Sequence, residues 1–262
     1  MRRIGGEWVL AAGLFLTACA APAPPPDPAE EAFLGDFRRV AYGTERPVLS
    51  NSGQSRLRRD HLAKWEIPIR AAFVGEVEAG DREAARRHLA DLGALTGLEI
   101  NEAAPGEANL LIFFADDPFA AARRHRGLYA HRIFDTRSFN DLLARMEQSA
   151  TCFGLLWGGW PGGKGIDFSV VFIRTDRGAR TVKGCLVQET TQILGLMNDL
   201  APDADSVFSD SGKQVDLTDQ DRLMIRLLYD ARLRPGMGWA EAEPLARAAL
   251  QELRNGTAPA GG

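Results

Sequence analysis

One eleven-residue stretch, from Gln188 to Asn198, spaces its polar side chains as an acid–base or metal site would. Because helix positions four apart share a face, the side chains of Gln188 and Gln192 would meet at one point, with Glu189 beside them. A glutamate in that position could act as a general acid or base. The amides of Gln188, Gln192 and Asn198, however, are not the imidazole, thiolate or carboxylate groups that build zinc sites. The residue types therefore predict no metal and no cofactor here.

The same stretch resembles the metzincin zinc-protease motif HExxHxxGxxH, in which three histidines bind zinc and the glutamate acts on the metal-bound water. Gln188, Gln192 and Asn198 stand at the three histidine positions. Glu189 and Gly195 are retained, and Gly195 is expected to end the helix in a conformation that costs other residues more. Without zinc, no bound water reaches a pKa near 7, so Glu189 has no activated nucleophile to generate. Asp199 beside Glu189 leaves a weak site for a hard cation open.

Further segments extend this resemblance to a family of uncharacterised bacterial lipoproteins described as degenerate zincins. They are Cys185-Leu186-Val187 before the motif, Leu228-Tyr229-Asp230, and Pro235-Gly236-Met237. At the place of the metzincin methionine turn, the chain has Ser206-Val207-Phe208. The resemblance implies a zincin-like, metzincin-type domain over residues 33–254, of the α/β (α+β) class, with a twisted mixed sheet and packed helices.

Hydrophobic periodicity predicts the elements that would position this stretch. Ala108–Ala115 (ANLLIFFA) is a continuous apolar run, as expected for a central buried strand. Cys152–Trp157 and Phe168–Arg174 are predicted strands joined by a Gly-rich hairpin, and Cys152–Trp157 is the candidate edge strand. The remaining predicted elements are strands at Trp65–Val74 and Leu98–Asn101 and helices at Asp81–Leu95, Ser138–Gln148, Ala179–Met197, Thr218–Leu228 and Trp239–Leu253.

The N-terminus is typical of a secreted lipoprotein. Arg2 and Arg3 precede an apolar run that is too short to span a bilayer, and Leu16-Thr17-Ala18-Cys19 resembles a lipobox. The resemblance to lipoprotein precursors implies removal of residues 1–18 and lipidation of Cys19. Because Ala20 is not an aspartate, it also favours the outer membrane. Residues 19–32, rich in proline, are expected to form an extended tether, and residues 255–262 a disordered tail.

Cys152 and Cys185 are the cysteines that remain available for pairing if Cys19 is lipidated. In an oxidising periplasm they would pair more often than stay free. Each also abuts a segment that the expected fold brings together. We therefore predict a Cys152–Cys185 disulfide, with two separate buried thiols as the alternative.

Other patterns predict less. Removal of residues 1–18 leaves a net charge near −5, which argues against a general nucleic-acid binder. Residues 158–164 (GGWPGGK) match the start of a phosphate-binding loop, but Gly165 replaces the required Ser or Thr and a strand follows, so no nucleotide site is expected. The cluster Arg123-Arg124-His125-Arg126 is interpreted as a solvated loop face in preference to a basic docking patch.

Three functions fit these observations. The first is a non-catalytic, pseudoprotease-like protein of the cell envelope that faces the periplasm, is anchored in the membrane through Cys19, and binds a peptide or an envelope protein in the former substrate cleft. The second is a hydrolase with an atypical metal site or with Glu189 as a metal-free acid or base. The third is a purely structural envelope lipoprotein. The three amides favour the first and third, and Glu189 alone favours the second.

Overall fold

A computed structural model describes residues 27–42, 60–133, 135–158, 165–209 and 211–256. Within these residues the chain forms a mixed α/β structure with one five-stranded sheet and seven α-helices. The signal segment, Cys19, the hairpin residues 159–164 and the last six residues lie outside the described residues. In the described part, no helix is both long and apolar enough to cross a membrane.

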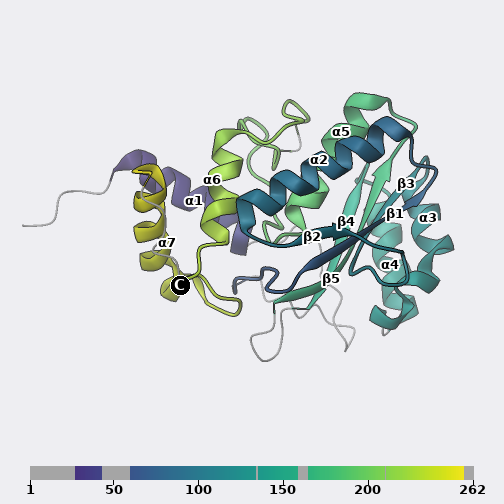
Figure 1. Cartoon of the computed structure of the whole chain (residues 1–262), viewed down its shortest axis with the longest axis horizontal. Coiled ribbons are helices and arrows are strands. Elements are labelled where there is room, and N and C mark those ends of the chain that lie inside the picture. Colours follow the sequence, from purple (N-terminus) through teal and green to yellow (C-terminus); the bar gives the residue numbers. More distant parts are fainter. Residues whose placement is uncertain (1–26, 43–59, 134, 159–164, 210, 257–262) are drawn as a thin grey trace, which may run out of the picture.

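The sheet runs in the order β2-β1-β3-β5-β4 (Figure 1). Its strands are β1 (Ile69–Gly75), β2 (Ile100–Glu102), β3 (Leu110–Ala115), β4 (Phe153–Gly158) and β5 (Ile166–Arg174). The pairs β1–β2, β1–β3 and β3–β5 are parallel, whereas β4 pairs with β5 antiparallel and forms one edge. The predicted hairpin and the predicted edge strand are both confirmed.

The burial of the central strand β3 explains the unbroken apolar run in its sequence. Successive side chains on a strand point to opposite faces, and both faces of this sheet are covered. Leu111 and Phe113 pack in one core, whereas Leu110, Ile112 and Phe114 pack in the other. All five side chains are therefore buried.

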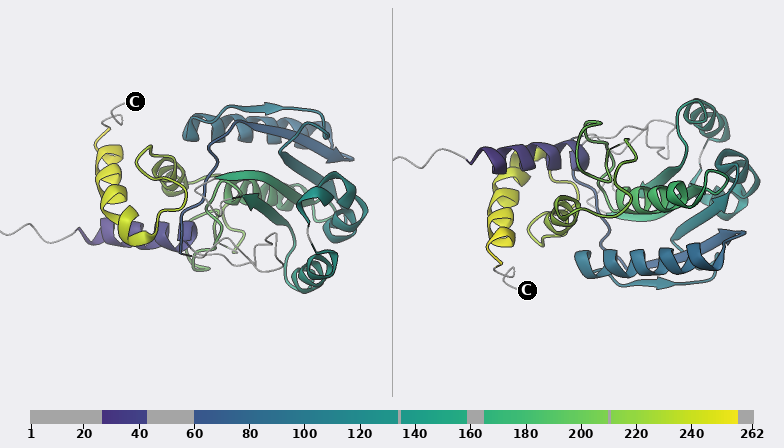
Figure 2. Two further views of the ribbon diagram at one scale, coloured as in Figure 1. Left: turned by 90° about the horizontal axis from the view of Figure 1, so that it is seen from below. Right: turned by 90° about the horizontal axis from the view of Figure 1, so that it is seen from above.

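Helices cover both faces of the sheet (Figure 2). One core receives side chains from α1, α2, α5, α6 and α7, and the other from α3 and α4. The helices are α1 (Pro28–Tyr42), α2 (Ala79–Thr96), α3 (Pro118–Arg124), α4 (Thr136–Met146), α5 (Ala179–Gln192), α6 (Asp219–Leu228) and α7 (Trp239–Arg254). Two short 3-10 turns, Arg126–Leu128 and Ala130–Arg132, follow α3.

Several predicted boundaries were wrong. The expected tether over residues 19–32 runs into α1, which begins at Pro28 and buries Glu30. The sequence also gave no prediction of α3. Asp81, the expected cap of α2, lies inside the helix, which begins at Ala79. The last helix extends to Arg254, and Asn255 forms its C-cap instead of starting a disordered tail.

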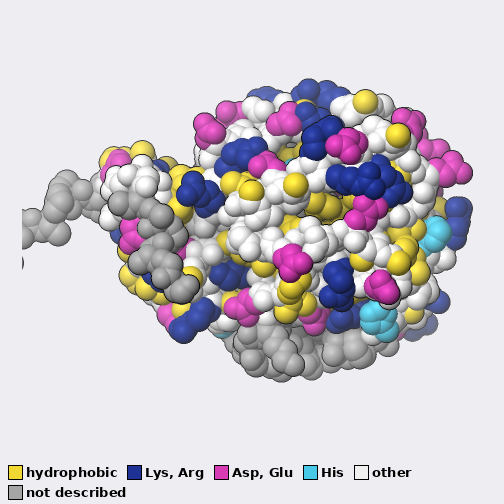
Figure 3. Space-filling view, in the orientation of Figure 1, with side chains coloured by type: hydrophobic (Ala, Val, Ile, Leu, Met, Phe, Trp, Pro, Cys, Tyr) yellow, Lys and Arg dark blue, Asp and Glu magenta, His cyan; other side chains and the backbone are white. Residues whose placement is uncertain are grey.

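The surface carries charges of both signs. On the face shown in Figure 3, the Lys and Arg side chains of the described residues are interspersed with Asp and Glu side chains. Arg82 and Arg86 of α2, for example, both contact the carboxylate of Glu102 on β2, each at 2.8 Å. Exposed pairs of this kind contribute little to stability, about 0–1 kcal/mol each.

Candidate functional site

The helix α5 carries the motif and lies against the edge of the sheet. It buries Val182, Leu186 and Val187 in the core shared with α2 and β5. Its last helical residue is Gln192, so the helix is shorter than predicted and the second half of the motif is a turn. The polar positions 188, 189 and 192 therefore sit on the last helical turn of α5, and position 198 lies beyond it.

Gly195 makes the turn that the sequence predicted. Its φ is +121°, a backbone conformation that side-chain-bearing residues rarely adopt. A Cβ at this position would lie 2.0 Å from the carbonyl oxygen of Ala63, so there is also no room for one. Backbone conformation and close approach of residue 63 both require glycine here.

Two aromatic side chains fix the end of α5. The indole Nε1 of Trp65 donates to the carbonyl oxygen of Ile193 at 2.8 Å, and the hydroxyl of Tyr229 donates to that of Leu194 at 3.0 Å. These carbonyls belong to the group that a helix end leaves without intrahelical partners. Tyr229 belongs to the LLYD segment, which is thereby placed directly beside the motif.

Glu189 lies beneath the edge strand. Its side chain is 4% exposed, and its Oε2 atom lies 3.5 Å from the position that a Cβ would take at Gly154 of β4. The same Cβ position lies 2.9 Å from Cγ2 of Ile193. The absence of a side chain at residue 154 therefore lets the strand approach the Glu189 carboxylate.

The three amides do not converge on one point. Gln192 donates from Nε2 to Oδ1 of Asp199 at 2.7 Å, and Asp199 is buried. Asn198 instead donates from Nδ2 to the carbonyl oxygen of Arg39 on α1 at 3.2 Å. Gln188 is half-buried on α5. The side chain that lies beside Gln192 is thus Asp199, one residue beyond the expected third position.

The donor set does not fit a tightly bound zinc ion. Glu189 and Asp199 supply carboxylates, but Gln188 and Gln192 present neutral amides where imidazoles would be needed. Among the described residues, no three His, Cys, Asp or Glu side chains are grouped closely enough to hold a metal ion.

The segment Ser206-Val207-Phe208, which the resemblance placed at the metzincin methionine turn, is a hydrogen-bonded loop. Ser206 donates from its hydroxyl to Oδ1 of Asp221 at 2.5 Å, and the amide of Val207 donates to Oδ2 at 3.1 Å. Asp221 also forms a capping box with Thr218 at the start of α6. One buried carboxylate therefore joins this loop to α6.

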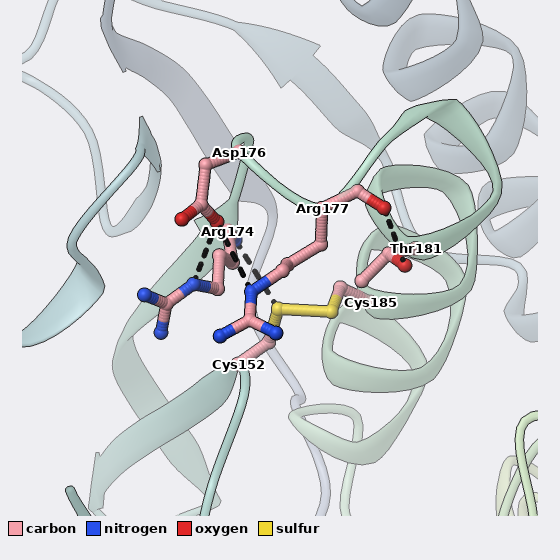
Figure 4. Close-up of a disulfide and its surroundings, with 6 residues drawn as sticks. All are labelled: Cys152, Arg174, Asp176, Arg177, Thr181 and Cys185. Carbon is pink, nitrogen blue, oxygen red and sulfur yellow. Dashed lines mark hydrogen bonds and ion pairs between the residues drawn. A yellow bond between two sulfur atoms is a disulfide. The ribbon is translucent and has the colours of Figure 1, made fainter.

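The predicted disulfide is confirmed and fastens the edge strand to α5 (Figure 4). Cys152, directly before β4, is bonded to Cys185 on α5, with their Cα atoms 5.9 Å apart. The Sγ atom of Cys152 also accepts a hydrogen bond from the amide of Arg174 at 3.2 Å. The cross-link thus lies one helical turn from Glu189, at the same strand–helix contact.

A cleft that was not predicted lies at the carboxyl ends of the parallel strands. It has a volume of about 840 Å³ and is lined by residues that follow β1, β3 and β5, among them Glu76, Asp116 and Thr175. The starts of α2 and α5 also line it, and they bring Asp81 and Ala179. Helix N-termini favour anions, but these carboxylates oppose that preference. Burial and the nearby Glu78 raise the pKa of Asp81.

Two members of the basic cluster, and Arg132 nearby, make contacts within the chain. Arg123 pairs with Glu147 at 2.6 Å, and the ring of His125 lies 5.6 Å from that of Phe113. Arg132 pairs with Asp167 at 2.9 Å and lies over the ring of Phe168. These contacts agree with a solvated structural face.

Comparison with known proteins defines the family without assigning an activity. No curated protein matches the chain. A family model described as "Protein of unknown function (DUF2927)" matches residues 31–248, which include the whole sheet, α5 and Gly195. The chain therefore belongs to the DUF2927 family.

Proposed function

We propose that this protein is a lipid-anchored protein of the cell envelope, held through Cys19 and facing the periplasm from the outer membrane. Its domain is a degenerate metzincin-like zincin that binds an extended peptide segment, free or within an envelope protein, along β4. It does so without cleaving the segment. The observation that carries the proposal is the placement of Glu189 beneath Gly154 of the edge strand.

Three features support the zincin-like frame. The edge strand β4 is antiparallel to a sheet that is otherwise parallel. The motif helix lies beneath this edge and ends before the positive-φ Gly195. The LLYD segment reaches back to the end of the motif helix through Tyr229.

The backbone of β4 has outward-facing groups that could pair with a peptide. The amide of Ser169 donates to Asn109 beside β3, so the amide of the next residue, Val170, faces β4. Leu155 is paired with Val170 and therefore directs its own N–H and C=O toward β5. Its neighbours Gly154 and Leu156 direct theirs away from the sheet, as β-strand addition requires.

The side chains beneath this edge do not favour hydrolysis. Gln192 and Asp199 form an amide–carboxylate pair that requires no cation. Asn198 is directed to α1. Without a metal to acidify water, Glu189 would have to act as an unassisted base, whose contribution is about 10²–10⁴-fold at best.

Peptide binding is tested with immobilised random peptides and two variants of one residue. Leu156→Pro removes an outward N–H and leaves the bonds to β5, whereas Leu156→Ala keeps the N–H and loses only side-chain atoms. We expect Leu156→Pro to abolish peptide capture and Leu156→Ala to retain it, with no cleavage products by mass spectrometry. Equal capture by both variants would exclude pairing with β4, and stoichiometric zinc in the purified protein would refute the non-catalytic assignment.

Restoring the ligands tests the frame. Gln188→His, Gln192→His and Asn198→His together should create zinc affinity if the backbone geometry is that of a zincin. Because Asp199 lies next to Gln192, we expect the pair Gln188→His and Gln192→His to suffice, with Asp199 as third ligand. At about 3 kcal/mol per ligand, three ligands correspond to a Kd near 1 µM or lower. A folded triple variant that binds no zinc would count against the zincin assignment.

Anchoring is tested by fractionation. The wild-type protein should partition with outer membranes, and Cys19→Ser should prevent that partitioning because acyl chains supply the anchor. Recovery of both forms in the same soluble fraction would refute the anchor and leave the peptide-binding proposal to its own test.

A further inference from the structure

A second cavity lies between α1 and the start of α7, where Asn198 of the motif turn forms part of its lining. Its volume is about 460 Å³. The chain segments that line it are far apart in sequence. They contribute Arg38, Arg39, Tyr42, Asp60, Asn198 and Trp239.

The cavity carries more positive than negative charge. Within the described part of the chain, Arg38 has no carboxylate partner, and its guanidinium lies 5.6 Å from the ring centre of Trp239. Arg39 donates from Nε to the main-chain oxygen of Asp199 at 2.8 Å, which orients the guanidinium without neutralising it. Asp60 is the carboxylate on the rim, and its Oδ1 contacts Nδ1 of His61 at 2.8 Å.

The wall of the cavity contains a buried donor. Tyr42 is 7% exposed, and its hydroxyl has no hydrogen-bond partner in the described part of the chain. Burial, and then the nearby carboxylate of Glu241, raise the pKa of Tyr42, so the hydroxyl keeps its proton and remains a donor. A buried polar group without a partner costs about 1–3 kcal/mol. Neighbouring atoms cover the hydroxyl in the free protein, so a ligand oxygen relieves that cost when these neighbours move aside on binding.

We propose that this cavity binds a phosphate ester. Arg38 and Arg39 both line the cavity, and two guanidinium groups suit a doubly charged phosphate better than a singly charged carboxylate. The cavity is larger than one phosphate group. The rings of Tyr42 and Trp239, whose centres are 5.3 Å apart, line the remaining space where the organic part would lie.

Two sources could supply such a group: a soluble phosphate ester or a phospholipid headgroup. If Cys19 is lipidated, the nine residues that lead to Pro28 span at most about 30 Å, so α1 begins within that distance of the headgroups. The cavity itself does not depend on that anchor or on peptide binding at β4.

The test uses the full chain carrying Cys19→Ser, so that no acyl chain inserts by itself. Binding of sn-glycerol 3-phosphate is measured by calorimetry, and binding of phosphatidylglycerol vesicles by flotation. Arg38→Gln with Arg39→Gln should weaken both at least tenfold. Tyr42→Phe should weaken binding about two- to tenfold without lowering stability, because the hydroxyl forms no bond to lose.

Gly35→Leu supplies an independent variant, because Gly35 on α1 also lines the cavity and a Cβ at this position meets no atom within 4 Å. The added side chain should occupy the cavity, abolish binding and leave the fold intact. Arg137→Gln with Arg145→Gln, both exposed on α4, removes the same charge elsewhere as a control.

Each outcome decides the proposal. Variant-sensitive binding of glycerol phosphate supports it with a soluble source, and variant-sensitive binding of vesicles alone supports it with a lipid source. Absence of both kinds of binding would overturn it. So would an equal loss in the α4 control, because binding would then depend on net charge and not on this cavity.

Discussion

Removal of the disulfide between Cys152 and Cys185 should cost a calculable amount of stability. The cross-link closes a loop with a sequence separation of 33 residues. The chain-entropy relation for a loop of that length gives about 3.7 kcal/mol at 25 °C. Replacing both cysteines with serine adds little to this value, because a serine hydroxyl at position 152 can still accept the amide hydrogen of Arg174.

The assay is urea unfolding followed by circular dichroism and by tryptophan fluorescence. With a slope of about 2–3 kcal/mol per molar urea, the midpoint should fall by about 1–2 M. Wild-type protein kept under reductant should unfold at the midpoint of the double variant, and reductant should not change the variant itself. A loss below about 1 kcal/mol would show that the loop is already restricted in the unfolded chain. Two free thiols in denatured, unreduced protein would refute the disulfide.

Three further predictions concern the surroundings of α5. Burial lowers the pKa of His88 to about 4, so the folded protein holds this ring neutral. The contribution of the neutral ring to the free energy of unfolding is complete above about pH 6.5 and is lost as the pH falls toward 4. That loss is about 3 kcal/mol, measured as the change with pH in the difference between wild type and His88→Leu. Gly154→Ala places a Cβ 2.9 Å from Ile193 and should cost about 1–3 kcal/mol in urea unfolding. Trp65→Phe removes the bond to the carbonyl of Ile193 and should cost about 1–3 kcal/mol, whereas Trp157→Phe should cost less, because the Nε1 of Trp157 has no partner in the described residues.

Local patterns predicted the elements that bury a continuous or periodic apolar surface. The continuous apolar run of β3 identified a strand covered on both faces, whereas its neighbours in the sheet were not predicted. The turn at Gly195 was predictable because a positive φ depends on the type of a single residue, and glycine adopts it most readily. The disulfide was predictable because the expected secretion and the order of the elements left one partner for each of the two cysteines.

Two helices were missed although the sequence contained their signals. The apolar residues Phe33, Leu34, Phe37, Val40 and Ala41 follow helical spacing and are all buried in α1. The prolines upstream obscured this signal, although proline is well tolerated in the first turn of a helix. For α3, the dipeptide before Phe119 supplies an N-cap aspartate and an N1 proline.

Contacts between distant segments were not predictable from any local pattern. The bond from Trp65 to Ile193 joins residues separated by 128 positions, and the hydroxyl of Tyr229 accepts from the amide of Trp65 across 164. The cavity that contains Tyr42 likewise depends on how α1 docks against α7. Such sites depend on how the whole chain packs, and no local pattern in the sequence encodes them.

The position of Asp199 shows why motif spacing alone misplaces a side chain. Counting along the motif makes Asn198 the third residue of the site. The chain beyond Gly195 is not helical, however, so packing decides the direction in which each side chain points. Leu196 and Leu200 are both buried in the core, and with these two anchored, Asp199 lies beside Gln192 and residue 198 faces α1. The Asp199 carboxylate accepts a hydrogen bond from the amide of Gln192, and this bond stabilises the turn. The same turn carries Asn198 to the wall of the cavity on α1. One turn therefore decides both which side chain lies beside Gln192 and which one reaches that cavity.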